Sequence, residues 1–151
     1  MSCIFCNYSQ NGPQVLYENE DFYIKIDLYP VSAKHLLIIP KKHILAFEEI
    51  LPIIHNWYFA IVKAKEITKE VNFGPLYTAE LNQNEHIERV LNSLFINQIP
   101  QDFNIGLNDG ICAGRTVHHM HWHLIPRYLD DVAECRGGVR NIIPLPFSKD
   151  W

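Results

Sequence analysis

The segment TVHHMHWHLIPRY, residues 116–128, carries four of the chain's eight histidines within six positions. His119, His121 and His123 fall on every second residue and alternate with apolar side chains. Successive side chains of a β-strand point to opposite faces, so a strand here would gather three imidazoles on one face. Near neutral pH, imidazole can act as a nucleophile, a proton carrier or a metal ligand.

Two other interpretations of this row remain possible from the residues alone. The histidines could be solvated side chains on a surface strand, although strict alternation with an apolar opposite face argues against that. They could also hold one metal ion together, because an H-x-H pair on a strand can place two imidazoles on the same metal.

A second group of residues that could do chemistry is the pair Cys3 and Cys6 in CIFC. Four cysteines in 151 residues are too few for a disulfide framework, so the pair suggests metal or redox chemistry in a reducing compartment. A redox pair is expected between a strand and the start of a helix, and this pair lies close to the first residue. The position favours zinc over redox chemistry, provided that two more ligands exist; the alternative is a thiol pair without metal.

These residues need a sheet to position them. The sequence predicts a hairpin over about 15–27, a buried strand over 35–40, and two further strands, FNIGLND and VHHMHWHLIP, joined by the glycine-containing stretch GICAGRT. Apolar residues at helical spacing after Pro52 predict a long helix with one face against the sheet. A second helical pattern runs from Ile87 to Phe95 and ends by Pro100. Strands, then helices, then strands indicate an α+β fold with an antiparallel sheet.

Composition narrows the class of protein. A chain of 151 residues with 48% hydrophobic and 20% charged residues fits one compact domain of enzyme size. The net charge of −4 and the absence of a basic stripe argue against a nucleic-acid duplex as partner. No signal-like segment or apolar run of about 20 residues is present, so we expect a cytoplasmic protein that does not enter membranes.

The sequence GRTVHHMHWHLIPRY resembles the signature of the histidine triad (HIT) family of nucleotide hydrolases and transferases. The blocks CIFC, IDLYPVSAKHLLIIPKKHI at 26–44, FNIGLNDG at 103–110 and RGGVRNIIP at 136–144 occur in the same order in bacterial members. The resemblance covers the chain except for about 73–100, where typical members are shorter. It implies one HIT domain over 1–151, with one long helix and an additional helix inserted at about 73–100.

The resemblance also implies catalytic roles. His121 would be the nucleophile that attacks the α-phosphate, forming a nucleotidyl-histidine that water later cleaves. His123 would donate a hydrogen bond to the non-bridging phosphate oxygens, where charge is stabilised in the transition state. His35 is placed close to them, either contacting phosphate or supporting the site.

Further substrate contacts follow from the same resemblance. In the loop NDGICAGRT, Asn108, Arg115 and Thr116 would supply donors near the attacked phosphorus, although members usually carry glutamine at the position of Arg115. Asp27 would accept hydrogen bonds from ribose hydroxyls; its alternative is a turn residue at a strand end. Lys25 stands where many members have an aromatic or aliphatic pocket residue. The apolar slot for the base, expected to be a purine, would consist of Ile4, Phe5 and Leu28.

A structural zinc ion is also implied. Several bacterial members join the amino-terminal C-x-x-C to the histidine after IPKK and to the first histidine of the row, which here gives Cys3, Cys6, His43 and His119. Two thiolates and two imidazoles make a closed tetrahedral site without an open position. If His119 is committed to zinc, the three alternating histidines do not share one catalytic metal. No organic cofactor is expected.

The predicted function is a nucleotidyl hydrolase that cleaves at the α-phosphate of a diadenosine polyphosphate or a nucleoside phosphoramidate. Both substrates present the same α-phosphate to His121, so the sequence does not choose between them. The alternative is a zinc-stabilised module that binds or senses nucleotides without turnover. Family members are commonly homodimers, and a homodimer is expected here.

Overall fold

The structure is a computed structural model that describes residues 3–8, 14–82 and 84–142. Its helices are α1 (Ile4–Tyr8), α2 (Ile54–Glu70), α3 (Phe73–Ala79) and α4 (Glu85–Leu91). Its strands are β1 (Val15–Glu18), β2 (Phe22–Ile26), β3 (Leu36–Pro40), β4 (Asp102–Leu107) and β5 (Trp122–Arg127). Short 3-10 helices span Phe47–Ile53, Ile111–Ala113 and Gly138–Ile142.

Within the described residues the strands form one five-stranded antiparallel sheet in the order β1-β2-β3-β5-β4. The predicted hairpin over 15–27 is β1 and β2, and the predicted buried strand is β3, whose five residues are all buried near the middle of the sheet. The predicted α+β architecture with an antiparallel sheet is confirmed.

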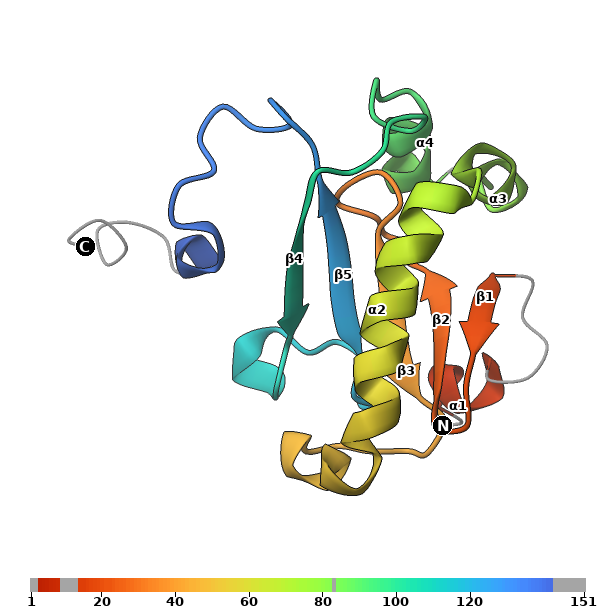
Figure 1. Ribbon diagram of the computed structural model, residues 1–151, viewed down its shortest axis with the longest axis vertical. Coiled ribbons are helices and arrows are strands. Elements are labelled where there is room, and N and C mark those ends of the chain that lie inside the picture. The colour runs from red at the N-terminus through yellow and green to blue at the C-terminus, as the bar shows by residue number, and fades with distance from the viewer. Residues whose placement is uncertain (1–2, 9–13, 83, 143–151) are drawn as a thin grey trace.

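The long helix α2 covers one face of this sheet, as Figure 1 shows. Its buried residues Ala60 and Ala64 are small, which allows the helix backbone to approach the strands closely. The apolar residues at helical spacing after Pro52 do not all face the sheet, because Ile54 and Tyr58 among them are exposed. Pro52 lies in the 3-10 helix that leads into α2 rather than in the first turn of α2 itself. The strand side chains packed on this face include Phe22, Ile24, Leu36, Ile38, Trp122 and Leu124.

The opposite face of the sheet is different, because it carries polar as well as apolar side chains. A small cluster of Phe5, Tyr23, Leu37 and Ile39 packs α1 against the sheet, and the Tyr23 hydroxyl donates to the Phe5 carbonyl oxygen at 2.7 Å. Beside this cluster, the alternation of β5 turns His123 towards the same face. One face of the sheet thus forms the core with α2, and the other face carries the candidate site.

The described part of segment 73–100 is helical, as expected for an insertion there, and holds two short helices, α3 and α4, in place of one. Asn72 and Asn84 each begin a helix, because their side-chain oxygens accept backbone N–H groups of the first turn. Pro75 does not break α3, because it lies in the first turn. Backbone nitrogens of the first turn make no hydrogen bond within the helix, so the missing N–H of proline costs nothing there. The helix expected to reach Phe95 ends at Leu91, and Leu94 is 85% exposed.

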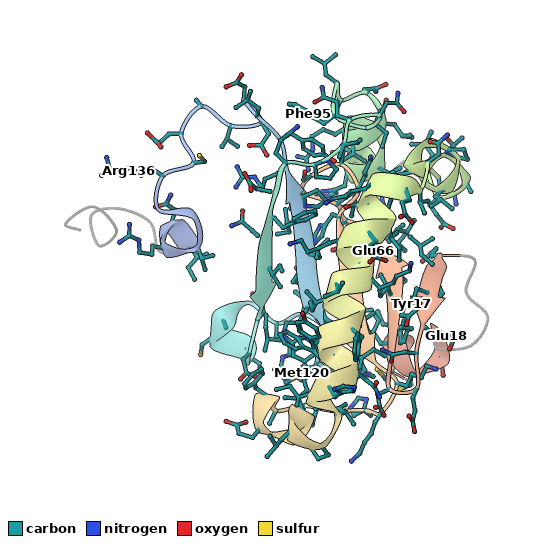
Figure 2. The ribbon with its side chains drawn as sticks, viewed as in Figure 1. Tyr17, Glu18, Glu66, Phe95, Met120 and Arg136 are labelled. Carbon is teal, nitrogen blue, oxygen red and sulfur yellow. The ribbon has the colours of Figure 1, made fainter. Side chains whose placement is uncertain are left out.

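The chain after β5 leaves the sheet beside β4, and Figure 2 shows Arg136 on this segment, set apart from the sheet. The last two residues of the block at 136–144 lie outside the described residues. None of the described helices has the length and apolar character that crossing a bilayer would require.

Candidate functional site

The row of alternating histidines straddles the start of β5. The strand begins only at Trp122, so His119 and His121 lie in the irregular segment that leads into it. The alternation nevertheless persists, because Met120 and Trp122 are buried in the core against α2 while the imidazoles of His121 and His123 stand 5.2 Å apart, centroid to centroid. The main chain of Met120 is held by its N–H, which donates to the Ile44 carbonyl oxygen at 2.8 Å.

A cavity of about 880 Å³ opens over this face of the sheet. It contains nine of the ten residues predicted to contact substrate or act on it; Arg115 is the exception. Those nine lining residues are Ile4, Phe5, Asp27, Leu28, His35, Asn108, Thr116, His121 and His123.

His121 lies at the wall of this cavity with only 6% of its surface exposed. Its Nδ1–H donates to the carbonyl oxygen of His119 at 2.8 Å, which leaves the lone pair on Nε2. The Phe5 ring meets it edge-on at 5.1 Å. Burial lowers the pKa of His121 more than the backbone hydrogen bond raises it, and His123 and Arg115 act in the same direction as burial. The site therefore favours a neutral imidazole with a defined tautomer.

Behind His121, three polar side chains form a connected group. His35 Nε2 and His123 Nδ1 share a hydrogen bond of 3.1 Å, and Asp27 Oδ2 lies 3.5 Å from His35 Nδ1 and 3.7 Å from His123 Nδ1. Burial lowers the pKa of His35 to about 4, despite the opposing charge of Asp27. Burial alone would raise the pKa of Asp27, but the two imidazoles and the backbone N–H of Tyr29 lower it to about 2. A carboxylate thus faces the histidines.

The loop between β4 and the histidine row turns at two glycines. Gly110 and Gly114 have φ values of 105° and 92°, a region that other residues rarely adopt. Arg115 leaves this loop but does not reach the cavity. Its guanidinium donates to the carbonyl oxygens of Asn108 at 3.0 Å and Leu45 at 2.6 Å, and it pairs with the Asp109 carboxylate at 2.7 Å. In this structure Arg115 holds the loop that carries Asn108 and Thr116.

Cys3, Cys6, His43 and His119 gather next to the histidine row, on the side of α1, with their ligand atoms within 4.8 Å of one another. His119 Nδ1 lies 3.3 Å from Cys3 Sγ and 3.5 Å from Cys6 Sγ, and His43 Nδ1 lies 3.3 Å from Cys6 Sγ. Tetrahedral zinc bonded to sulfur and nitrogen separates its ligands by about 3.6 Å, so the spacing fits a metal ion. His119 Nε2–H donates to the Pro40 carbonyl oxygen at 2.8 Å, which leaves Nδ1 as the ligand atom.

The described residues contain one other group of possible metal ligands, Asp27, His35 and His123. Neither group contains all three alternating histidines. The geometry therefore does not favour the interpretation that His119, His121 and His123 share one ion.

Several cavity residues were missed by sequence reasoning. Leu37 was missed because β3 is buried on both faces, so no alternation marks the side of the cavity. Gly106 lies beside His123 in the β4 and β5 register, with no atom within 4 Å of the place a Cβ would occupy. A glycine inside a strand pattern often marks a place where a ligand or another backbone approaches closely. This signal could have identified Gly106 from the sequence. Asn104 and Arg127 line the far end of the cavity.

Comparison with known proteins gives relatives over most of the chain. An uncharacterised HIT-like protein of Methanocaldococcus jannaschii is 30% identical over 145 residues, covering 93% of this chain and 91% of its own. An asymmetrical bis(5'-nucleosyl)-tetraphosphatase of Schizosaccharomyces pombe is 28% identical, covering 82% of this chain and 54% of its own. An adenosine 5'-monophosphoramidase of Candida albicans is 28% identical, covering 83% and 70%.

Among solved structures, a Zn-bound histidine triad family protein of Mycobacterium smegmatis superposes with a TM-score of 0.56. It is 27% identical and covers 88% of this chain and 80% of its own. A family model of the HIT domain matches residues 9–130, which span the sheet, the histidine row and the long helix. The chain therefore belongs to the HIT family.

Proposed function

We propose that this protein is a nucleotidyl hydrolase that cleaves nucleoside phosphate conjugates at the α-phosphate through a covalent bond to His121. The observation that carries the proposal is the tautomer of His121: its Nδ1–H is engaged by the His119 carbonyl oxygen, and it borders a cavity large enough for a nucleotide. Relatives named as a dinucleoside tetraphosphatase and a nucleoside phosphoramidase act on this class of substrate.

In the first step, the Nε2 lone pair of His121 attacks the α-phosphorus and forms an N–P bond. The bond from phosphorus to the leaving group breaks, and the leaving group departs with its electron pair and takes up a proton from solvent. The imidazole becomes cationic, and the hydrogen bond from Nδ1–H to the carbonyl oxygen of His119 stabilises that charge. In the second step, water attacks phosphorus and gives up a proton to solvent, the N–P bond breaks, and a nucleoside monophosphate is released with His121 neutral again.

The other cavity residues position the substrate. His123, held by His35, donates to the non-bridging oxygens, and Asn108 and Thr116 supply further donors at the phosphate. Asp27 lies where it can accept hydrogen bonds from the ribose hydroxyls as well as orient the histidines. The base then lies towards α1, between the apolar side chains of Ile4, Phe5 and Leu28.

We further propose that Cys3, Cys6, His43 and His119 hold a structural Zn²⁺ ion. The support is the mixed sulfur and nitrogen donor set, its spacing, and the hydrogen bond from His119 Nε2–H to the Pro40 carbonyl oxygen, which orients the ring. Bound there, the ion would supply no reaction chemistry; it would fix α1 and the backbone that leads to His121.

A turnover assay with diadenosine tetraphosphate and adenosine 5'-phosphoramidate tests the proposal directly. We expect release of AMP by the unmodified chain and loss of at least a thousandfold in kcat in His121→Asn, with nucleotide binding retained. His118→Asn is the matched control, since His118 is exposed and outside the alternating row. The competing function is a zinc-stabilised nucleotide-binding module. No AMP release by the unmodified protein, with nucleotide bound, would establish that function instead.

A further inference from the structure

Gly106 lies beside the reacting centre, at a position where any other residue would place a side chain in the cavity. It pairs with His123 across β4 and β5, and residues paired across antiparallel strands point to the same face of the sheet. Its neighbour Leu107 packs against the core on the other face. A side chain at position 106 would therefore project into the cavity, which Gly106 already lines.

Neither the backbone nor the packing of the described residues requires a glycine here. Gly106 is not among the glycines with a positive φ, the backbone conformation that side chains rarely adopt. No described atom lies within 4 Å of the place that a Cβ would occupy, so a side chain would meet nothing in the chain itself. A glycine inside a strand weakens the strand, because it adds backbone entropy and no packing. What Gly106 contributes is open space beside His123.

The cavity continues past Gly106, away from the end at α1 that we assign to the base. Asn104 and Ile125 form the next pair on this face of β4 and β5, and both line the cavity. Gly138 and Val139, from the segment after β5, line it as well. A second cavity of about 480 Å³ adjoins this end, because three of these four residues also line that cavity, all but Val139. The far end therefore offers room beyond the nucleotide.

In-line displacement directs the leaving group towards this room. When Nε2 of His121 attacks phosphorus, the leaving group departs from the opposite side. On the cavity face His123 and then Ile125 follow His121 along the chain. A group that departs away from His121 therefore passes over His123 and its strand partner Gly106.

We propose that Gly106 sets the size of the leaving group, and that the space over it admits one as large as a nucleoside polyphosphate. This inference rests on the proposed function, from which it takes the attack by His121 and the position of the base. Diadenosine tetraphosphate and adenosine 5'-phosphoramidate present the same AMP moiety to the site. Their leaving groups are ATP and ammonia, so a side chain at position 106 would obstruct only the first.

Steady-state kinetics of Gly106→Val with these two substrates tests the inference. We expect kcat/KM to fall by about tenfold or more for diadenosine tetraphosphate and to stay within about twofold of the wild type for the phosphoramidate. Gly106→Ala adds one methyl group and should cause a smaller loss, again with the tetraphosphate alone. Asp102→Val is the control, because Asp102 is exposed on the same strand and lines neither cavity. It should change neither kcat/KM.

The contrast between the two substrates separates the possible results. An equal loss with both would assign the effect to the AMP site or to the fold and overturn the inference, as would a Gly106→Val variant that cleaves both like the wild type. If Gly106→Val does not fold, as judged by circular dichroism, the alanine variant decides. A wild type that cleaves only the phosphoramidate would overturn the inference and leave the proposed function standing. Release of AMP from neither substrate would remove both.

Discussion

The side chain of Arg115 shows how a residue expected to contact substrate can instead hold a loop in place. Its side chain is 7% exposed, and its three polar contacts join the loop after β4 to Leu45. We expect Arg115→Met to lower the free energy of unfolding by about 1 kcal/mol, because the loop loses its charge-assisted hydrogen bonds to the Asn108 and Leu45 carbonyl oxygens and to the Asp109 carboxylate. Urea denaturation measures this, with the exposed Arg140→Met as control. An unchanged stability combined with a large rise in KM would instead make Arg115 a direct substrate contact.

His35 makes the stability of the fold depend on pH. Its pKa is about 4 in the folded chain and about 6.5 when unfolded, so the unfolded state binds more protons between these values. Stability is therefore retained above pH 6.5 and lost as the pH falls towards 4, by up to about 3 kcal/mol for this residue. Between pH 6.5 and pH 4, the free energy of unfolding should therefore fall by about 3 kcal/mol less in His35→Gln than in the wild type. The exposed His55→Gln should behave like the wild type. Parallel curves for His35→Gln and wild type would contradict the assignment.

The histidine row could be predicted from the sequence because alternation along a strand depends only on neighbouring residues. His121 and His123 could be placed on one face from spacing alone, and the core position of Trp122 agrees. The contacts of Arg115 could not be predicted, since they depend on the path of a loop and on the distant carbonyl of Leu45. The contact of His35 with His123 joins residues 88 positions apart, so it was expected from the family resemblance and not from local spacing.

At the scale of elements, α1 is a helix of five residues that has little to hold it in isolation. We expect one zinc ion per chain, and Cys3→Ala should lose the metal and release α1, withdrawing Phe5 from His121. Metal analysis measures the first effect and amide hydrogen exchange over residues 4–8 the second. Cys112→Ala is the control, because Cys112 is exposed and outside the ligand group. A zinc-free wild type, or a Cys3→Ala variant that keeps its metal, would refute the site.

The helices of segment 73–100 support the loop that borders the cavity. The Asn84 side-chain amide donates to the Leu28 carbonyl oxygen at 2.7 Å, and Arg89 donates to the Pro30 carbonyl oxygen at 3.1 Å. Asn84→Asp keeps the cap of α4 but loses the donor to Leu28. We expect it to raise KM for nucleotide substrates several-fold with little change in kcat, in steady-state kinetics. Asn92→Asp, at the exposed end of α4, is the control and should change neither KM nor kcat. An unaltered KM in Asn84→Asp would show that α4 does not support the loop at Leu28.

Element type was more predictable than element length. The hairpin of β1 and β2 follows from β-branched and aromatic runs around a polar turn, which act locally. The end of α4 does not follow from periodicity, because Phe95 continues the helical spacing yet leaves the helix and stacks on Tyr128, with ring centroids 4.9 Å apart. Tertiary packing overrides propensity at that point, and only the folded sheet supplies Tyr128.

At the scale of the whole molecule, the described residues of the single chain leave an apolar stripe on α2 exposed. Leu51, Ile54, Tyr58 and Val62 are exposed and follow helical spacing through the 3-10 helix and α2, on the side turned away from the sheet. Contiguous exposed apolar side chains mark an interaction surface, and a symmetric pair of such stripes is self-complementary. We propose on this basis that a second copy of the chain covers the stripe, giving the homodimer expected for the sequence.

The dimer can be tested by placing charge in the stripe. Ile54→Glu together with Tyr58→Glu should convert a dimer of about 35 kDa, twice the 17.6 kDa chain, into a monomer in sedimentation equilibrium. Two buried carboxylates facing their symmetry mates would each have to lose hydration without a cationic partner. Leu94→Glu is the control, because Leu94 is also apolar and is more exposed than Ile54 or Tyr58 but lies outside the stripe, and it should leave the mass unchanged. A wild-type monomer, or a double variant that remains dimeric, would show that this face of α2 is not where two copies meet.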